Sequence, residues 1–291
     1  MKSSATVAYA AAMLIGQPSR TALAAAAHRA AHQVLEGGRI FADPLAVRIL
    51  GRDAARAIED MQQPLRRAMR IFIAARTRFA EDALAAAVAH GVRQLVVLGA
   101  GLDTYAYRSV FGDRLHIFEV DHPATQGWKR ERLAAAGISI PPSLTFAPVD
   151  FEHATLAAGL AAAGFDPTRR TFFTWLGVVP YLTQQSVFAT LSFIGALPGG
   201  AHVVFDYGNP PDTLAQRARE VHDVRAAKVA ALGEEWKSYF EAPALHERMR
   251  TLGFSEFEDL SPPQIATRFF PERTVVAPAS GGHILLAATR P

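Results

Sequence analysis

The sequence predicts a single α/β domain, in which a mostly parallel sheet is covered by helices on both faces and preceded by a cap of helices. Two observations predict this fold. From residue 93 onward, short apolar runs alternate with segments of helical pattern, which is typical of βαβ units. The first apolar run, Gln94 to Leu98, leads directly into Gly99-Ala100-Gly101, as expected for a buried parallel strand that ends in a tight turn beside a ligand.

The predicted elements divide residues 1–291 into four parts of this one domain. These are a helical cap with a long helix (1–92), a cofactor-binding α/β core (93–208), a helical lid (209–253) and closing strands (254–291). Strands are predicted at 94–98, 115–120, 144–149, 170–176, 201–207, from 253–254 and at 283–288. Helices are predicted at 20–36, 64–90, 123–136, 155–163, 183–197, 210–231 and 243–252, with a short helix begun by Pro44 and with Ser19 as the first N-cap.

Composition excludes several kinds of site and favours a protein of the cytoplasm. Half of the residues are hydrophobic, and none is cysteine, which removes disulfides, thiolate nucleophiles and zinc–thiolate sites. Lys2 followed by the apolar run from Ala5 to Ile15 resembles a signal peptide only weakly. No stretch of 18 uninterrupted apolar residues is present, so we expect no membrane span, and we expect no metal site.

Charge is distributed unevenly along the chain. The net charge is +3, but residues 1–98 carry +6 and residues 99–291 carry −3. A basic N-terminal third can attract an anionic substrate, although arginines spread along helices also suit a merely solvated surface. No block of five or six like charges is present, so we expect no nucleic-acid partner.

The glycine turn favours a nucleoside ligand that lacks phosphates. Glycines at this point let the backbone approach a ligand without a Cβ atom. The dinucleotide pattern wants a third small residue where this chain has Thr104, and the bulky Thr-Tyr-Ala-Tyr-Arg that follows does not suit a pyrophosphate at a helix N-terminus. S-adenosylmethionine is the commonest nucleoside of this kind, and NAD(P) is the weaker alternative.

Carboxylates at two further strand ends complete the predicted site. Glu119 and Asp121 lie 18 and 20 residues after Gly101, a spacing that suits hydrogen bonds to two ribose hydroxyls. Both side chains leave the same face of the strand, although Asp121 could instead cap the helix that follows. Asp150, at the end of the third strand, can accept a hydrogen bond from the adenine amine while Phe151 packs on the ring; a helix cap is again the alternative.

Five segments of the chain resemble the leucine carboxyl methyltransferase family, in its bacterial S-adenosylmethionine-dependent branch. They are Arg76-Thr-Arg78, QLVVLGAGLDTYAYR (94–108), FEVDHP (118–123), VDF (149–151) and WLGVVPYLT (175–183), in that order. PSRTALAAAAHRA (18–30) and FADPLA (41–46) are similar too, so the resemblance covers residues 18–208 closely. It implies a Rossmann-like class I methyltransferase fold, whose seven-stranded sheet has an antiparallel last strand, with S-adenosyl-L-methionine as cofactor.

The resemblance also implies a set of cofactor contacts. Arg76 would pair with the methionine carboxylate, Asp121 would hold the ribose, and Asp150 and Phe151 would hold the adenine. The full set of expected cofactor positions is Arg76, Gly99, Ala100, Gly101, Glu119, Asp121, Asp150, Phe151 and Leu176. Many relatives carry a glutamate against the cofactor at the position of Leu176, and leucine cannot make its hydrogen bonds. The residues alone do not choose Arg76 over Arg78.

Methyl transfer is an in-line displacement at a sulfonium methyl, so alignment and exclusion of water supply most of the acceleration. A carboxylate acceptor is already ionised at pH 7 and needs positioning cations, whereas a phenol benefits from a general base. Side chains considered for these roles are Arg76, Arg78, Arg108, His122, His283 and Tyr181, and no catalytic residue is assigned among them. Aromatic residues expected near the acceptor pocket, or simply in the core, are Tyr105, Tyr107, Trp175, Tyr181 and Tyr207.

We therefore expect an O-methyltransferase with a small-molecule acceptor, a carboxyl acceptor being weakly favoured over a phenol. The segment from Pro210 to Phe240 is expected to cover the acceptor as a lid or to form the surface of a homodimer. A non-catalytic nucleoside-binding protein and an NAD(P)-dependent oxidoreductase are the alternatives.

Overall fold

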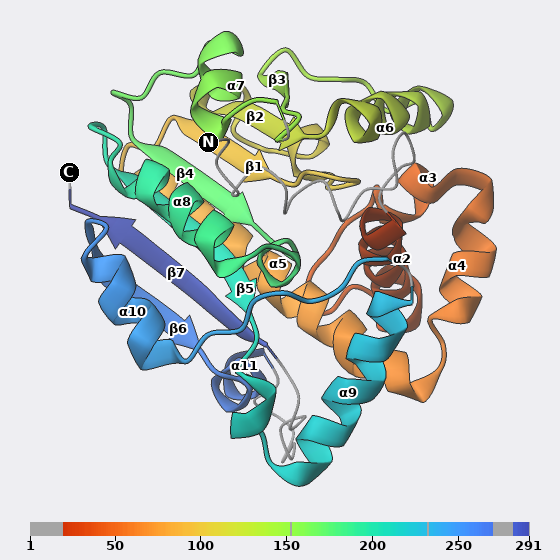
Figure 1. The fold of residues 1–291 in the computed structure, drawn as a ribbon. Coiled ribbons are helices and arrows are strands. Elements are labelled where there is room, and N and C mark those ends of the chain that lie inside the picture. The colour runs from red at the N-terminus through yellow and green to blue at the C-terminus, as the bar shows by residue number, and fades with distance from the viewer. Residues whose placement is uncertain (1–19, 152, 232, 270–281, 291) are drawn as a thin grey trace.

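The computed structural model describes residues 20–151, 153–231, 233–269 and 282–290 and builds them around one sheet. The strands are β1 Gln94–Leu98, β2 His116–Asp121, β3 Leu144–Pro148, β4 Thr171–Trp175, β5 Ala201–Tyr207, β6 Phe254–Leu260 and β7 His283–Thr289. They stand in the order β3-β2-β1-β4-β5-β7-β6, and β7 is antiparallel to both of its neighbours (Figure 1). The predicted seven-stranded, mostly parallel sheet with an antiparallel last strand is confirmed.

The helices follow the predicted alternation. They are α2 Arg20–Leu35, α3 Ala46–Leu50, α4 Ala54–Asp60, α5 Pro64–Ala89, α6 Pro123–Ala135, α7 Leu156–Ala162, α8 Gln184–Gly195, α9 Gln216–Ala230, α10 Ala242–Arg250 and α11 Pro262–Phe269. Short 3-10 turns lie at η1 Gly51–Asp53, η2 Tyr105–Tyr107, η3 Gly112–Arg114, η4 Val179–Tyr181 and η5 Pro211–Thr213. The sequence did not predict α4 or α11. The expected N-cap Ser19 and the apolar run before it lie outside the described residues.

The prediction that a helix starts at Pro210 is wrong. Pro211–Thr213 form only the short turn η5, and the backbone of Leu214 and Ala215 is extended, so α9 begins at Gln216. The two prolines fix φ but leave ψ free, and an extended residue directly after the turn stops the helix from propagating. The covering helix is therefore shorter than predicted.

Alternate residues of the strands belong to two hydrophobic clusters on opposite faces of the sheet. Val96 and Leu98 of β1 pack with residues of α7, α8 and α10, whereas Leu95 and Val97 pack with α5 and α11. This alternation follows from the two-residue period of a strand and explains why β1 is apolar along its whole length. Within the described chain, none of the helices combines the length and apolar character that crossing a bilayer requires.

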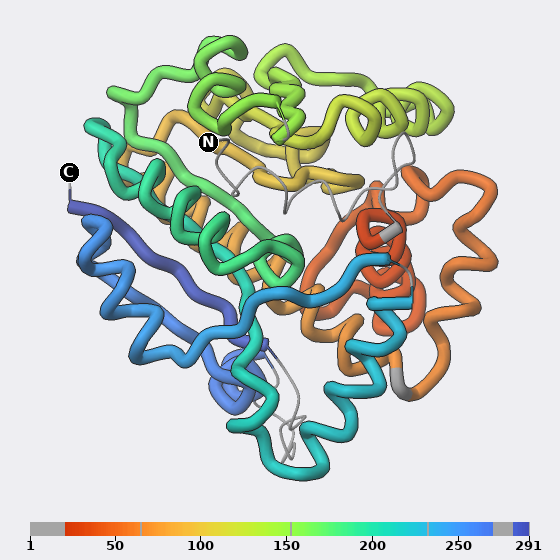
Figure 2. The backbone as a smooth tube through the Cα atoms, viewed as in Figure 1, coloured from red at the N-terminus to blue at the C-terminus, as the bar shows by residue number. Residues whose placement is uncertain are grey.

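The first helices form a third cluster at the carboxyl edge of the sheet. Helices α2, α3, α4 and α9 gather off the ends of the parallel strands, as the ribbon and the tube both show (Figures 1 and 2). The alanines of α2, from Ala26 to Ala31, are nearly or fully buried and let α2 lie close to Ile49 and Leu50 of α3. The cap therefore lies against the edge where parallel α/β sheets bind their ligands.

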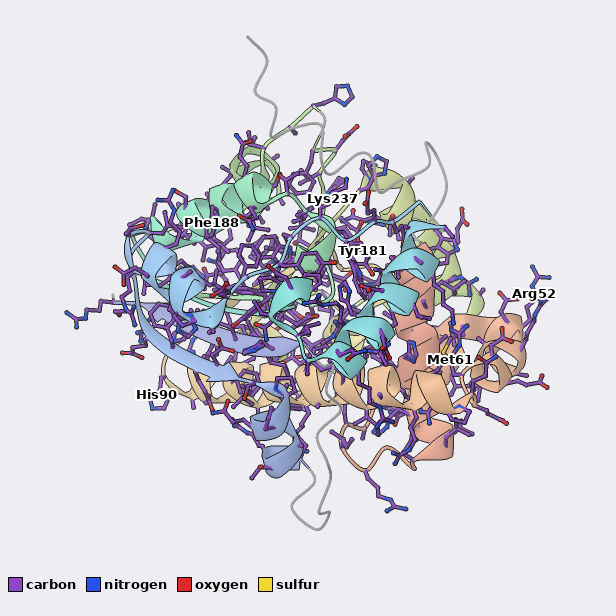
Figure 3. All side chains as sticks on the ribbon, turned by 60° about the horizontal axis from the view of Figure 1, so that its bottom comes forward. Arg52, Met61, His90, Tyr181, Phe188 and Lys237 are labelled. Atoms are coloured by element: carbon purple, nitrogen blue, oxygen red, sulfur yellow. The ribbon has the colours of Figure 1, made fainter. Side chains whose placement is uncertain are left out.

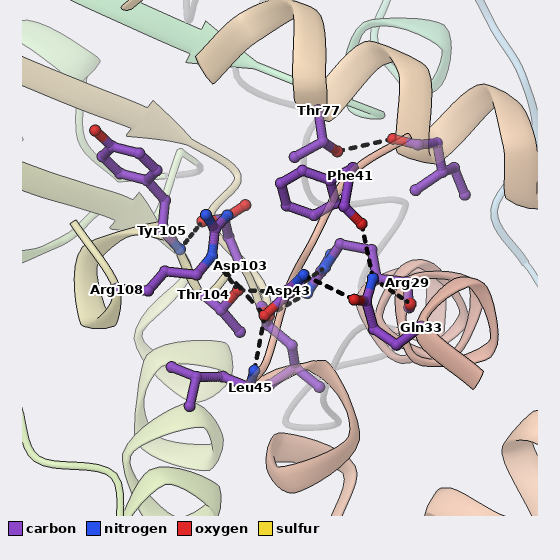
Figure 4. A network of polar contacts seen from close by, with 12 residues as sticks. Arg29, Gln33, Phe41, Asp43, Leu45, Thr77, Asp103, Thr104, Tyr105 and Arg108 are labelled. Atoms are coloured by element: carbon purple, nitrogen blue, oxygen red, sulfur yellow. Dashed lines mark hydrogen bonds and ion pairs between the residues drawn. The ribbon is translucent and has the colours of Figure 1, made fainter. Parts of the chain in front are cut away.

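A buried carboxylate fastens this cap to the turn after β1 (Figure 4). Asp43 has no exposed surface and accepts hydrogen bonds from Thr104 Oγ1 at 2.7 Å, from Leu45 N at 3.0 Å and from Arg29 Nε at 3.3 Å. Arg29 also donates to the carbonyl of Leu102 at 2.5 Å. Arg108 pairs with Glu81 and completes the network from the side of α5.

We predict that Asp43→Ala lowers the free energy of unfolding by at least about 3 kcal/mol, because it leaves the buried Arg29 guanidinium without its carboxylate. Urea denaturation followed by circular dichroism measures the change. Asp53→Ala is the matched control, since Asp53 pairs with Arg132 while 56% exposed, and it should cost less than about 1 kcal/mol. Equal losses in the two variants would contradict this role for Asp43.

Candidate functional site

The carboxyl ends of β1, β2, β4 and β5 open onto one cavity of about 1050 Å³. Helices α2, α5 and α9 line it from the other side, together with the segments that follow β4 and β5. The volume is at the upper end of what small-molecule sites occupy, so it can hold a nucleoside and a second small molecule together.

The glycine turn lines this cavity and packs tightly against α2. Gly101 has φ +43°, and a Cβ added to it would lie 2.8 Å from the Cβ of Ala22 on α2. Its backbone nitrogen donates to Oδ2 of Asp121 at 2.6 Å. Glycine is therefore needed here for the close approach of α2, as well as for the approach of a ligand.

Asp121 presents a carboxylate to the cavity, with both of its oxygens held by backbone donors. Its Oδ1 accepts from the backbone nitrogen of His122 at 2.7 Å, it lines the cavity, and it is 6% exposed. Burial raises the pKa of the Asp121 carboxyl, against the opposing effect of the two backbone donors. The alternative that Asp121 caps α6 does not match the structure, because the N-cap is His122, whose Nδ1 accepts from Ala124 N.

Glu119 leaves the same face of β2 but does not line the cavity. It is 1% exposed, its Oε2 lies 2.6 Å from Nζ of Lys129, and it accepts from the hydroxyl of Tyr107 at 3.3 Å. Burial raises the pKa of the Glu119 carboxyl to about 7, although Lys129 opposes the shift. The structure thus brings Asp121, but not Glu119, to the turn.

Arg76 reaches the cavity from the middle of α5 and is held by Asp206 at the end of β5. Arg76 Nη1 lies 2.7 Å from Asp206 Oδ2, and Asp206 Oδ1 accepts from Gly177 N at 2.6 Å. Gly177 has φ +72°, and a Cβ there would lie 2.6 Å from Arg76 Nη2. Arg76 Nε is buried without a partner among the described residues. The guanidinium is therefore fixed against the backbone at the end of β4.

Asp206 was not predicted as a site residue, although a signal was present. The strand AHVVFDY (201–207) carries an acid next to its last residue, and the carboxyl ends of parallel strands share one edge. Leu176, where many relatives carry glutamate, lines the cavity and packs against the apolar cluster under α5. Asp206 also lines the cavity, from the end of the neighbouring strand β5.

The expected adenine contacts do not line the cavity. The Asp150 side chain is 34% exposed and lies 2.9 Å from Nδ1 of His153, while Phe151 is half-buried against the core on the α8 face. Val97 to Asp103 and Asp121 are the nearest parts of that edge that do line it. Gly99 and Ala100 thus line the cavity with Gly101, whereas Asp150 and Phe151 are not among its described lining residues, and their contact with adenine stays a prediction.

Of the six side chains considered for catalysis, Arg76 and Tyr181 line the cavity and the other four are not among its described lining residues. Arg78 is half-exposed and pairs with Asp82 one helical turn away, and Arg108 is held between Glu81 and the Phe41 ring. His122 is the N-cap described above. Tyr181 lies inside the molecule beside α9 (Figure 3), and burial raises the pKa of its phenol.

The predicted aromatic lining is only partly present. Tyr181 and Tyr207 line the large cavity, Tyr105 lines a small neighbouring one, Tyr107 contacts Glu119, and Trp175 is in the core at 1% exposed. The Tyr207 hydroxyl donates to Asp259 at 2.5 Å, and His283 Nδ1 lies 2.9 Å from the same carboxylate. His283 therefore belongs to a network beside the cavity. Its Nε2 contacts Asn209, which lines the cavity.

We predict that Asp121→Ala weakens S-adenosylhomocysteine binding at least about tenfold, because charge-assisted hydrogen bonds to the ribose are lost. Isothermal titration calorimetry measures the affinity. Asp113→Ala, at an exposed carboxylate in η3, is the control and should bind as the wild type does. An unchanged affinity in a folded Asp121→Ala protein would contradict the assignment.

We predict that Arg76→Met also weakens S-adenosylhomocysteine binding at least about tenfold, whereas Arg78→Met changes it less than about twofold. Arg76 is buried beside the turn, but Arg78 makes an exposed pair on the same helix. The two variants remove the same group two residues apart, so calorimetry on both tests the site and not the charge of α5. Similar losses in both would count against the placement of Arg76.

Comparisons with known proteins identify the family. The leucine carboxyl methyltransferase family model matches residues 22–195. The chain is 37% identical over 203 residues to YktD of Bacillus subtilis, covering 68% of this chain and 66% of that protein. A relative from Mycolicibacterium paratuberculosis is 34% identical over 218 residues, covering 69% and 67%. Both are named as S-adenosyl-L-methionine-dependent methyltransferases.

A solved structure agrees with this fold. It is a duf574 family protein from Streptomyces avermitilis, which is 16% identical and covers 90% of this chain and 97% of its own, with a TM-score of 0.50. That likeness concerns the fold alone. The family model and the sequence relatives carry the assignment: the chain belongs to the leucine carboxyl methyltransferase family, whose fold is that of class I S-adenosylmethionine-dependent methyltransferases.

Proposed function

We propose that the protein transfers a methyl group from S-adenosyl-L-methionine to an oxygen of a small molecule. The observation that carries this proposal is that one cavity joins the glycine turn, Asp121 and Arg76 to a wider space under α9. The residues fit the cofactor, because a carboxylate suits the ribose hydroxyls and a buried guanidinium suits the methionine carboxylate. We also propose the cytoplasm as its compartment, since a chain without cysteine needs no oxidising environment.

The bound cofactor would supply an electrophilic methyl group on a sulfonium, and its neutral leaving group needs no acid. The protein's contribution would be alignment and exclusion of water. Asp206 fixes the Arg76 guanidinium, and the backbone nitrogen of Gly101 fixes the Asp121 carboxylate, so two ends of the cofactor would meet groups that are already oriented. Helix α9 forms the opposite wall and would keep water from the acceptor.

The placement of histidines supports a carboxyl acceptor over a phenol. His122 caps a helix and His283 lies behind Asn209, so neither of the predicted bases reaches the cavity. His222 and His28 do line it, but the Nε2 of His222 lies 3.0 Å from the hydroxyl of Tyr239. Burial lowers the pKa of His28 to about 3, so this imidazole is too weak a base for a phenol. Tyr181, with its raised pKa, stays protonated at pH 7 and can donate a hydrogen bond but not take a proton. An ionised carboxylate needs no base.

The two alternatives differ in what they leave unexplained. The packing of α2 on Gly101 leaves little room for a pyrophosphate at the turn, which weighs against NAD(P). A non-catalytic nucleoside-binding protein is favoured only by Leu176, which cannot make the hydrogen bonds of the glutamate that many relatives carry there. Activity measurements separate it from the enzyme.

We predict that the protein transfers label from S-adenosylmethionine with a tritiated methyl to a member of a panel of carboxylic acids and phenols. Methyl esters release labelled methanol in mild base and methyl ethers do not, so base treatment tells the two acceptor classes apart. We expect base-labile label, and its loss in Arg76→Met. Binding of S-adenosylhomocysteine without transfer to any compound would favour the non-catalytic alternative, and base-stable label would identify a phenol.

A further inference from the structure

A buried polar cluster beside the cavity is not used by the function proposed above. Its centre is Asp259 on β6, whose side chain is 8% exposed. Asp259 accepts from the hydroxyl of Tyr207 at 2.5 Å and lies 2.9 Å from both His246 Nε2 and His283 Nδ1. Burial by itself would raise the pKa of the Asp259 carboxyl, but the hydrogen bonds from His283 and Tyr207 outweigh it and lower that pKa below its ordinary value. Asp259 is therefore an ionised carboxylate that accepts from all three neighbours.

Asp259 fixes which nitrogen of His283 carries the hydrogen. An ionised carboxylate can only accept hydrogen bonds, so Nδ1 of His283 must be the donor. Tyr207 stacks on the imidazole, with ring centroids 4.8 Å apart, and directs its own hydrogen to the same carboxylate. In a neutral imidazole one nitrogen is a donor and the other an acceptor, so Nε2 of His283 is left as an acceptor.

This acceptor orients the side-chain amide of Asn209. Asn209 Nδ2 lies 3.2 Å from His283 Nε2, and only the NH2 end of the amide can donate to that nitrogen. Pro210 follows directly and restricts the backbone of Asn209 to extended conformations. Asn209 is half-buried and lines the cavity, and its Oδ1 has no hydrogen-bond partner among the residues that the structure describes. The chain of contacts from Asp259 thus ends in an oriented amide oxygen at the cavity wall.

The cluster lies on the side of β5 that faces away from Arg76. Asp206 and Tyr207 are successive residues of β5, so their side chains leave opposite faces of the sheet. Asp206 holds Arg76 of α5, whereas Tyr207 packs in the hydrophobic cluster on the α8 and α10 face. β5 is also two strands away from β1, or about 10 Å at the usual spacing. Asn209 therefore borders the space that the proposed cofactor contacts leave for the acceptor.

An oriented amide oxygen in this position suits an uncharged hydrogen-bond donor. A half-buried acceptor that finds no donor costs free energy, and a ligand hydroxyl would remove that cost. An ammonium group would need a carboxylate of its own, but Asp259 is already occupied by three donors. Sites built to bond a substrate hydroxyl discriminate strongly against the analogue that lacks it.

We propose that the methyl acceptor carries a hydroxyl group besides the oxygen that is methylated, and that this hydroxyl donates to Oδ1 of Asn209. Asn209 is then a specificity-determining residue, and His283 and Asp259 are positioning residues that hold its amide. The inference rests on the proposed function, which it deepens by narrowing the acceptor to a hydroxy-carboxylic acid.

The test compares meta- and para-hydroxybenzoate with meta- and para-fluorobenzoate, by calorimetry on protein saturated with S-adenosylhomocysteine. Fluorine is similar to a hydroxyl in size but has no hydrogen to donate. We expect at least one hydroxybenzoate to bind at least about fivefold more tightly than its fluoro analogue. Asn209→Leu should bring this ratio toward one, while the affinities for the fluorobenzoates and for S-adenosylhomocysteine stay within about twofold.

His283→Phe and His246→Phe form a matched pair, because each removes one imidazole that contacts Asp259. Only His283 also contacts Asn209, so His283→Phe should lose the preference for the hydroxyl and His246→Phe should keep it. Equal affinity for hydroxy and fluoro probes in the wild type, binding of neither, or the same loss in both histidine variants overturns the proposal. A loss of S-adenosylhomocysteine affinity in Asn209→Leu would assign the amide to the cofactor and also overturns it.

Nitrogen-15 NMR of the wild-type imidazoles at pH 8 tests the orientation without relying on a variant's fold. We expect His283 to carry its hydrogen on Nδ1, and the shift of its Nε2 to change in Asn209→Leu. Hydrogen on Nε2 would require Asn209 to turn its oxygen toward His283 and overturns the proposal. If S-adenosylhomocysteine does not bind, the proposed function fails; if it binds and the hydroxyl preference is absent, this inference alone fails.

Discussion

The turn after β1 is held from two sides, and the arrangement of the site depends on this. From the sheet, Asp121 accepts the backbone nitrogen of Gly101. From the cap, Arg29 donates to the carbonyl of Leu102 while its own position is fixed by Asp43. The turn is thus rigid before any ligand arrives, and a ligand that binds there loses little free energy to ordering the protein. The same contacts set the position of α2, which forms the opposite wall.

Charge in the interior is arranged in matched pairs. Glu119 with Lys129, Arg76 with Asp206 and Arg29 with Asp43 each place opposite charges together, as burial requires. Two of these pairs, Arg76 with Asp206 and Arg29 with Asp43, lie beside the cavity and fix side chains that line it.

Local sequence patterns could predict the sheet because each strand is a short apolar run that ends at a turn. Six strands lie within one residue of prediction at each end, from Gln94–Leu98 to His283–Thr289. The start of α9 could not be predicted, because it depends on the backbone of two residues after a proline turn. Glu119 and Asp121 leave the same face of one strand. Only the position of Lys129 on α6 shows that Glu119 forms a buried ion pair and does not line the cavity as Asp121 does. Placing Asp206 at the site required knowing that β5 is the strand next to β4.

The structure gives a physical reason why Arg76, and not Arg78, faces the cavity. A helix turns each successive side chain by about 100°, so two residues of separation place Arg78 on the solvent side with Asp82.

A crystal structure with S-adenosylhomocysteine tests the central claim most directly. We expect the ribose hydroxyls within hydrogen-bond distance of the Asp121 carboxylate and the amino-acid carboxylate of the ligand against Arg76. A nucleoside bound elsewhere, with Gly101 and His122 as the only partners of Asp121, would contradict it.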